Sequence, residues 1–244
     1  MTGHLSTSTY LDALRRDGDA LVSACAHHPD ALVSSCPGWT ATDLLTHVCR
    51  IYRYVARQAH SGEQVERDTT DIAAVDAPAL TADALAELLV VLAEVEPTAP
   101  SWNWARSAEN TAAFWPRRMA METAIHRWDA QAAVGTPAPF EPALACDGVD
   151  EVLSVFLPAR RGRAKEDLTG TAHLHATDAP SSVPAEWTLT FEPQGAMTVR
   201  HVHEKADAAL RGPAGALFLA VWGRDTEGLE RFGDEAVAAA VRAQ

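Results

Sequence analysis

The sequence has few cysteines, no dense cysteine pattern and no long apolar run. Its four cysteines are scattered without a CxxC pair, which is typical of free thiols in a reducing cytoplasm rather than of a disulfide framework. The first residues lack the apolar core of a signal peptide, and no stretch approaches the roughly 18 apolar residues of a membrane helix. We therefore expect a cytoplasmic protein with no membrane partner.

Positive charge is also scarce. The chain has 20 Lys and Arg against 33 Asp and Glu, a net charge of −13 at pH 7. Nucleic acids and anionic membranes attract clustered positive charge, so neither is an expected partner. A glycine-rich phosphate loop, a GxSxG elbow and a catalytic cysteine motif are absent too, which argues against those enzyme classes.

What is present is a helical pattern followed by a strand pattern. The 244 residues, 47% of them hydrophobic, can bury a sizeable core in one large domain or two small ones. Apolar residues recur at helical spacing in the first part of the chain. The expected helices are residues 7–27, a helix that begins after Thr40 and runs to about residue 58, and residues 81–95, 111–134 and 144–157.

A charged, glycine-containing stretch, 158–167, has the composition of a linker. After it the pattern alternates with period two, which predicts short strands. The expected strands are 171–177, 186–192, 197–203 and a further one at 206–211, with helices at 214–222 and 235–242. The fold class is therefore mixed: an up-down helical bundle, residues 1–157, followed by a small α+β domain, residues 168–244.

The helix at 111–134 carries a candidate metal-binding pair. Glu122 and His126 are four residues apart, so both side chains lie on one face and can converge on one point. A carboxylate and a neutral imidazole suit zinc or a similar divalent ion, which needs a third protein ligand. The same spacing also serves an ordinary hydrogen-bonded pair, and that alternative stays open.

The third ligand we expect is His47. It falls on the apolar stripe of its helix with Leu44, Val48 and Val55, and so points towards the core. A buried histidine that bonds a backbone carbonyl is the simpler alternative. Cys49, about 200° round the helix from His47, is poorly placed to bind the same ion.

The stripe of the 111–134 helix is unusually polar. Beside Glu122 and His126 it carries Arg118 and Asp129, and buried ionisable groups are costly unless they are paired or bind an ion. Asp129 is suited to hold His126 from behind, or to form a salt bridge. Arg118 could form a salt bridge with Glu122 or Asp129, and it would then not be available to bind a substrate.

Histidines of the expected strands form a rival cluster. His173 and His175 share one strand face, and His201 and His203 share another, so four imidazoles could meet across a sheet. The alternative is that these histidines are simply the polar residues of alternating strands, on a sheet face that is exposed to solvent.

Three motifs carry a family resemblance: CPGWTATDLLTHV, FWPRRMAMETAIHRWDAQAAVG and ALRGPAGALFLAVWGR. Together they resemble the mycothiol-dependent maleylpyruvate isomerase family, a branch of the DinB-like metal-binding bundles known from actinomycetes. The similarity implies a divalent metal, typically zinc, on His47, Glu122 and His126, with mycothiol as thiol cosubstrate. It also implies a C-terminal domain, similar to sterol-carrier domains, that lends an arginine, which we assign to Arg224.

The resemblance implies a metal-dependent isomerase or S-transferase that acts on a small, electrophilic, anionic substrate. A coordinated thiol loses its proton and can attack, and Arg224 would hold a carboxylate or enolate. Met121 stands where many relatives carry His, and Cys49 where Gly is common, and both are expected to alter the pocket. A monomer and a homodimer are both compatible with the sequence.

Two other kinds of function stay open. A hydrolase could use the same three ligands with metal-activated water. A binding protein could keep the bundle without catalysis. A requirement for thiol in activity assays would distinguish our hypothesis from the hydrolase. The metal content of the purified protein would distinguish it from the binding protein.

Overall fold

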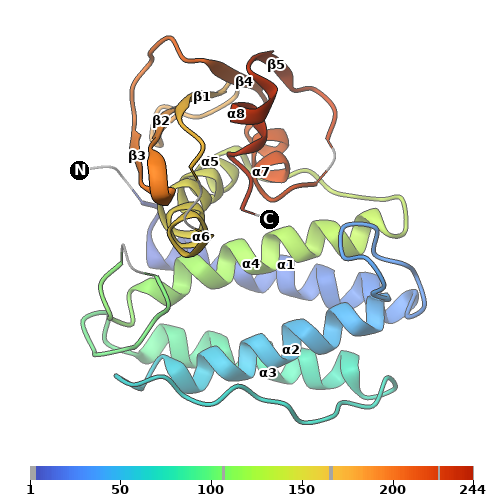
Figure 1. The fold of residues 1–244 in the computed structure, drawn as a ribbon. Helices are drawn as coiled ribbons and strands as arrows, with labels where there is room; N and C mark the ends of the chain where they lie inside the picture. The colour runs from blue at the N-terminus through green and yellow to red at the C-terminus, as the bar shows by residue number, and fades with distance from the viewer. Residues whose placement is uncertain (1–3, 106–107, 165–166, 225, 244) are drawn as a thin grey trace. The chain divides into compact units, whose positions relative to one another are not determined.

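The computed structural model describes residues 4–105, 108–164, 167–224 and 226–243, and the chain divides into two compact units (Figure 1). The helical unit consists of Ser6–Trp104 and Ala108–Ala138. The sheet unit consists of Pro139–Gln244 with the short segments Met1–Leu5 and Ala105–Ser107. The mixed fold class, a helical bundle followed by an α+β part, is confirmed. In the described part of the chain, no helix combines the length and apolar character that a membrane crossing needs.

The helical unit is a bundle of four long helices: α1 (Thr7–His27), α2 (Ala41–Gln58), α3 (Ala77–Glu94) and α4 (Phe114–Ala132). Helix α1 packs on α4 and α3, and α2 packs on α3. Their apolar stripes meet in a core where Leu14, Leu44, Val48 and Leu88 are fully buried. Gly18 lies at a close approach of α1 to α3, because a Cβ there would be 2.5 Å from a methyl carbon of Leu85.

Helix α2, which carries His47, begins at the residue that the sequence predicts. Thr40 is its N-cap in extended conformation, and its hydroxyl accepts a hydrogen bond from the backbone N–H of Asp43. The Asp43 carboxylate in turn accepts from the backbone N–H of Thr40 at 2.8 Å. This reciprocal capping box satisfies two backbone donors that the first turn cannot satisfy itself, and it holds the pKa of Asp43 below its usual value.

The cap makes a testable contribution to stability. Thr40→Ala removes the hydroxyl acceptor and is expected to lower the free energy of unfolding by about 1 kcal/mol, the usual cost of losing such a cap. Urea denaturation followed by circular dichroism measures the difference. Thr98→Ala, at an exposed threonine outside the helices, is the control, and an equal loss in both variants would contradict the capping argument.

The sheet unit begins with a helical stretch that runs without a break from Pro142 to Ala164. It consists of α5 (Pro142–Glu151), a π-helical segment η1 (Val152–Phe156) and α6 (Leu157–Ala164). The prediction of a linker at 158–167 is therefore wrong for residues 158–164, which are helical. Residues 165–166 of the predicted linker lie outside the described residues. The compact units change at Pro139, whereas the sequence analysis ended the helical domain at residue 157.

The reason for this error is a buried arginine. Arg161 is fully buried, and its guanidinium carbon lies 4.5 Å from the centre of the Phe191 ring. Its Nη2 also donates to the carbonyl oxygen of Leu168 at 3.0 Å. This charged stretch has the composition of a solvated linker, yet it forms a packed helix. It can do so because the buried guanidinium makes a cation–π contact with an aromatic ring.

The sheet has five strands in the order β3-β2-β1-β4-β5. The strands are β1 (Gly170–Ala176), β2 (Glu186–Phe191), β3 (Met197–Arg200), β4 (Ala208–Gly212) and β5 (Glu230–Gly233), with a 3-10 turn η2 (Pro193–Gly195) between β2 and β3. β1 and β4 are parallel, and the other pairs are antiparallel. The predicted strand 197–203 is three residues too long, since β3 ends at Arg200. β5 was not predicted, because all four of its residues are exposed and show no alternation.

Two short helices complete this unit, α7 (Ala214–Val221) and α8 (Glu235–Ala239). Helix α7 packs against α5, β1 and β4. The alternation of β1 follows from this packing: Ala172 and Leu174 are fully buried, while His173 and His175 project from the opposite face of the sheet.

Candidate metal centre

Helices α2 and α4 bring His47, Glu122 and His126 together. One potential ligand atom from each residue lies within 4.8 Å of the other two. His47 reaches the cluster from the middle of α2, and Glu122 and His126 from successive turns of α4. A hydrogen bond of 2.8 Å between Tyr52 and Thr123, both buried, ties the two helices together beside the cluster. The three residues selected from the sequence therefore form one group.

The spacing of the three side chains suits a divalent ion. Nε2 of His47 lies 3.4 Å from Oε1 of Glu122, and Nε2 of His126 lies 3.3 Å from the same oxygen. Two ligand atoms that each bind a tetrahedral zinc at about 2.1 Å are about 3.4 Å apart. Two nitrogens and one oxygen form a donor set that zinc accepts, with a fourth position left for another ligand.

The carboxylate of Glu122 is surrounded by Arg118 and the two histidines. Nη2 of Arg118 donates to Oε2 of Glu122 at 2.9 Å, so the pairing that the sequence left open is made with Glu122. Burial alone would raise the pKa of Glu122, but hydrogen bonds from His126 and His47 and the charge of Arg118 lower that pKa well below its usual value. The carboxylate is therefore ionised at neutral pH, with Oε1 directed at the histidines.

Asp129 holds the imidazole of His126 from the other side. Oδ2 of Asp129 accepts from Nδ1 of His126 at 3.0 Å, and Oδ1 accepts from the hydroxyl of Ser35 at 2.6 Å. With Nδ1 occupied, Nε2 of His126 is the nitrogen that faces Glu122. A carboxylate behind a ligating histidine is the usual way in which proteins orient such a ring.

These contacts also set the protonation of His126. Burial alone would lower its pKa, but the hydrogen bonds to Asp129 and Glu122 raise it to about 9. The imidazole is therefore protonated at neutral pH when no metal is bound. A metal ion must displace that proton, so metal binding is expected to release it.

The cluster is most exposed at His47. The side chain of His47 is 33% exposed, against 17% for Glu122 and 10% for His126. The ring of Trp39 lies 5.1 Å from the His47 ring, centre to centre. A small molecule that approaches the cluster within the helical unit would therefore meet His47 first.

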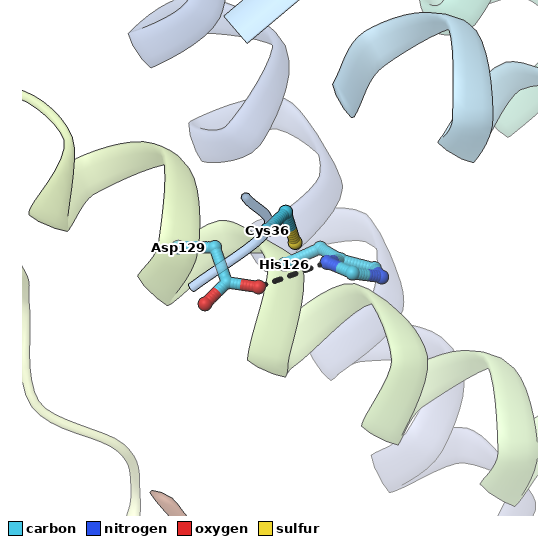
Figure 2. Close-up of side chains that lie close together, drawn as sticks. All are labelled: Cys36, His126 and Asp129. Carbon is cyan, nitrogen blue, oxygen red and sulfur yellow. Dashed lines mark hydrogen bonds and ion pairs between the residues drawn. The ribbon is translucent and has the colours of Figure 1, made fainter. Parts of the chain in front are cut away.

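Cys36 is a neighbour that the sequence analysis missed. Figure 2 shows its thiol beside His126 and Asp129, and these three residues also form a group with ligand atoms within 4.8 Å of one another. The Asp129 carboxylate, however, already accepts hydrogen bonds from His126 and Ser35. The group of His47, Glu122 and His126 is therefore the better candidate for a metal site, with Cys36 as a thiol next to it.

Comparisons with known proteins agree with these motifs. Residues 11–131 match the model of the mycothiol maleylpyruvate isomerase N-terminal domain, and residues 143–240 match the model of the C-terminal domain of the same family. The chain belongs to the mycothiol-dependent maleylpyruvate isomerase family. This membership places it in an enzyme family, as the sequence predicted.

Solved structures show the same fold. A crystal structure of the mycothiol-dependent maleylpyruvate isomerase has a TM-score of 0.62 and 15% identity, with 93% of each chain covered. A histidine-to-alanine mutant of that enzyme has a TM-score of 0.64 and 14% identity, again with 93% of each chain covered. No curated protein sequence matches the chain.

Two positions that depart from the family pattern are both fully buried. Met121 lies in α4 next to Glu122, and Cys49 lies in α2. The thiol of Cys49 donates to the carbonyl oxygen of Leu80 in α3 at 3.5 Å, so Cys49 is directed at α3. The side chain of Cys49 is thus used in packing between α2 and α3, and the expectation that Cys49 and Met121 alter the pocket stays a prediction.

Arg224 lies in the sheet unit just after α7. Its residue surface is 5% exposed, and its Nη1 donates to the carbonyl oxygen of Trp222 at 2.8 Å. The proposed role of Arg224 towards a substrate stays a prediction.

The support that Asp129 gives to His126 can be tested directly. Asp129→Asn keeps the size of the side chain but removes its charge, and it is expected to weaken zinc binding by about 10- to 100-fold, the usual effect of losing such a partner. Competition with a chromogenic chelator measures the affinity. Asp83→Asn, which changes an exposed carboxylate of α3, is the control, and an equal affinity in Asp129→Asn and the unmodified protein would contradict the orienting role.

Proposed function

We propose that this protein is a metal-dependent enzyme that uses mycothiol to isomerise, or to transfer sulfur to, a small electrophilic anion. The observation that carries the proposal is the group of His47, Glu122 and His126 on α2 and α4, with ligand-atom separations of 3.3 and 3.4 Å. Family membership supports mycothiol as the thiol. Maleylpyruvate, the substrate in the family name, is the first compound to try.

We further propose that the metal is zinc, because the donor set is two imidazole nitrogens and one carboxylate oxygen. When bound at this site, a divalent ion with an open position would lower the pKa of a thiol that reaches it. Arg118 pairs with Oε2 of Glu122, and Asp129 keeps Nε2 of His126 directed towards the same carboxylate. The protein thus supplies a site of fixed geometry and charge.

Arg224 is proposed to bind the anionic group of the substrate. A guanidinium can hold a carboxylate through two parallel hydrogen bonds, and it can stabilise negative charge that develops on an enolate. Addition of the thiolate to an activated double bond, followed by its departure, would isomerise the substrate. If the thiol stayed bound and the enolate took up a proton from water, the addition would be S-transfer.

The protein is proposed to work in the cytoplasm, as a monomer or homodimer, on a small molecule. All four cysteines are free, and three of them are buried, which suits a reducing compartment. A requirement for mycothiol also needs a compartment in which low-molecular-weight thiols stay reduced.

The decisive experiment is a screen of small electrophilic anions against zinc-loaded protein, with and without mycothiol. Turnover of maleylpyruvate or a related compound only in the presence of both zinc and mycothiol is expected. Turnover without thiol, with cleavage of a substrate bond by water, would assign the hydrolase alternative. Stoichiometric zinc without turnover of any compound would assign a non-catalytic binding protein.

A further inference from the structure

The sheet unit contains a second group of metal-ligand side chains, which we call the strand cluster: His173, His175, Glu186 and His203. His173 and His175 project from one face of β1. Glu186 opens β2 and is paired directly with His175, so its side chain is on the same face. His203 follows the end of β3, the strand on the other side of β2.

The carboxylate of Glu186 lies between three imidazoles. Nδ1 of His203 is 2.9 Å from Oε2 of Glu186, and Nε2 of His173 is 3.5 Å from the same oxygen. Nε2 of His175 is 3.7 Å from Oε1. The ring centres of His173 and His203 are 4.9 Å apart. His173, Glu186 and His203 each offer an atom within 4.8 Å of the others.

This arrangement differs from the rival cluster expected from the sequence. His201 is not a member, because its Nε2 lies 2.6 Å from Oδ1 of Asp150 in α5. The same oxygen accepts from the indole N–H of Trp187 at 3.0 Å. Since β3 ends at Arg200, His201 and His203 are outside the strand and face different partners. Glu186, which the sequence analysis did not include, takes the place of His201.

One histidine of the strand cluster, His173, is buried rather than solvated. His173 is 7% exposed, and its buried Nε2 has no hydrogen-bond partner within the described part of the chain. The Glu186 oxygen at 3.5 Å makes no well-formed hydrogen bond to this nitrogen, and a buried nitrogen that is so poorly satisfied calls for a ligand or water.

We propose that the strand cluster binds a divalent transition-metal ion of the zinc class through His173, Glu186 and His203. The 3.5 Å between Nε2 of His173 and the Glu186 oxygen is the separation of two neighbouring zinc ligands, about 3.4 Å. The His203 side chain is 72% exposed and can adjust, so it can exchange its hydrogen bond to Glu186 for the ion. His175 stands beside the group as a further donor.

The expected role of this ion is to tie β1, β2 and the segment after β3 together. Binding must immobilise the exposed His203 side chain, which lowers affinity. The strand cluster is therefore expected to bind zinc more weakly than the group on α2 and α4. The proposal is independent of the proposed enzymatic function, because the two groups of ligands share no residue.

Zinc titration of the chelator-stripped full chain by calorimetry tests the proposal. Two ions per chain are expected for the unmodified protein and for the control Lys205→Ala, an exposed neighbour of His203. One ion is expected for His203→Ala and for Glu186→Gln. These variants avoid the buried His173, whose replacement could disturb folding.

His47→Ala separates the two sites. This variant is expected to keep the weaker ion, and zinc is expected to raise its melting temperature but not that of the His47→Ala, His203→Ala double variant. Two ions in His203→Ala, or a single ion in the unmodified protein that His203→Ala retains, would overturn the strand site. A loss in His203→Ala but not in His47→Ala would leave the strand site standing and refute the ligand assignment on α2.

Discussion

His47→Ala is expected to lower the affinity for zinc at the group on α2 and α4 by at least tenfold and to abolish mycothiol-dependent turnover. The substitution removes one of three ligand atoms, and the loss of even an outer partner of a metal ligand costs about that much affinity. The remaining pair, Glu122 and His126, lies on a single helix and leaves two coordination positions to water. Equilibrium dialysis against buffered zinc and a turnover assay at saturating zinc measure the two effects.

The fold should survive this change, which makes the result easy to interpret. The His47 side chain is a third exposed, so its truncation leaves the core of the bundle intact. His60→Ala, an exposed histidine just after α2, is the matched control and should change neither zinc affinity nor turnover. If purified His47→Ala kept one zinc with unchanged affinity at this site, the ligand assignment would be wrong.

Arg224→Ala is expected to lower turnover by about 100-fold or more while leaving zinc binding unchanged. This is the scale for removing one preorganised donor to developing charge, about 2.7 kcal/mol of transition-state stabilisation. Arg224→Lys should restore little activity, since a point charge cannot form the paired hydrogen bonds of a guanidinium. Steady-state kinetics with separate kcat and KM values, together with zinc content, checks the prediction.

Because Arg224 is buried, a loss of stability must be separated from a loss of catalysis. Thermal unfolding of Arg224→Ala and Arg224→Lys gives that measure, and the exposed Arg231→Ala is the control for removing a positive charge from the same unit. A variant Arg224→Ala that is as stable and as active as the unmodified protein would remove Arg224 from the mechanism. The sheet unit would then be assigned to stability or partner binding.

Much of the helical unit could be read from local sequence. The bounds of α1 and the start of α2 depend on near neighbours: apolar residues at helical spacing and the reciprocal bonds of Thr40 and Asp43. The convergence of Glu122 and His126 also follows from helical spacing alone. Residues three or four apart on a helix meet whatever the rest of the chain does, so such features are predictable without a structure.

The errors occurred where contacts between distant segments outweigh local pattern. Residues 158–164 resemble a linker by composition, yet they are helical because Arg161 packs on Phe191 from another element. β5 has no alternation of its own and is a strand because β4 offers it hydrogen-bonding partners. His201 and His203 alternate in sequence, but Asp150 from α5 binds one of them.

The sequence by itself determined the order of helices α1 to α5 and strands β1 to β4, the inward-facing ionisable stripe of α4 and the family of the protein. Only the tertiary structure decided which side chains share a site. It placed His47 against Glu122, Ser35 and Cys36 beside Asp129 and His126, and Glu186 among the histidines of the sheet. The physical reason is that local periodicity sets the direction of a side chain along its own element, whereas the packing of one element on another determines which distant groups it meets.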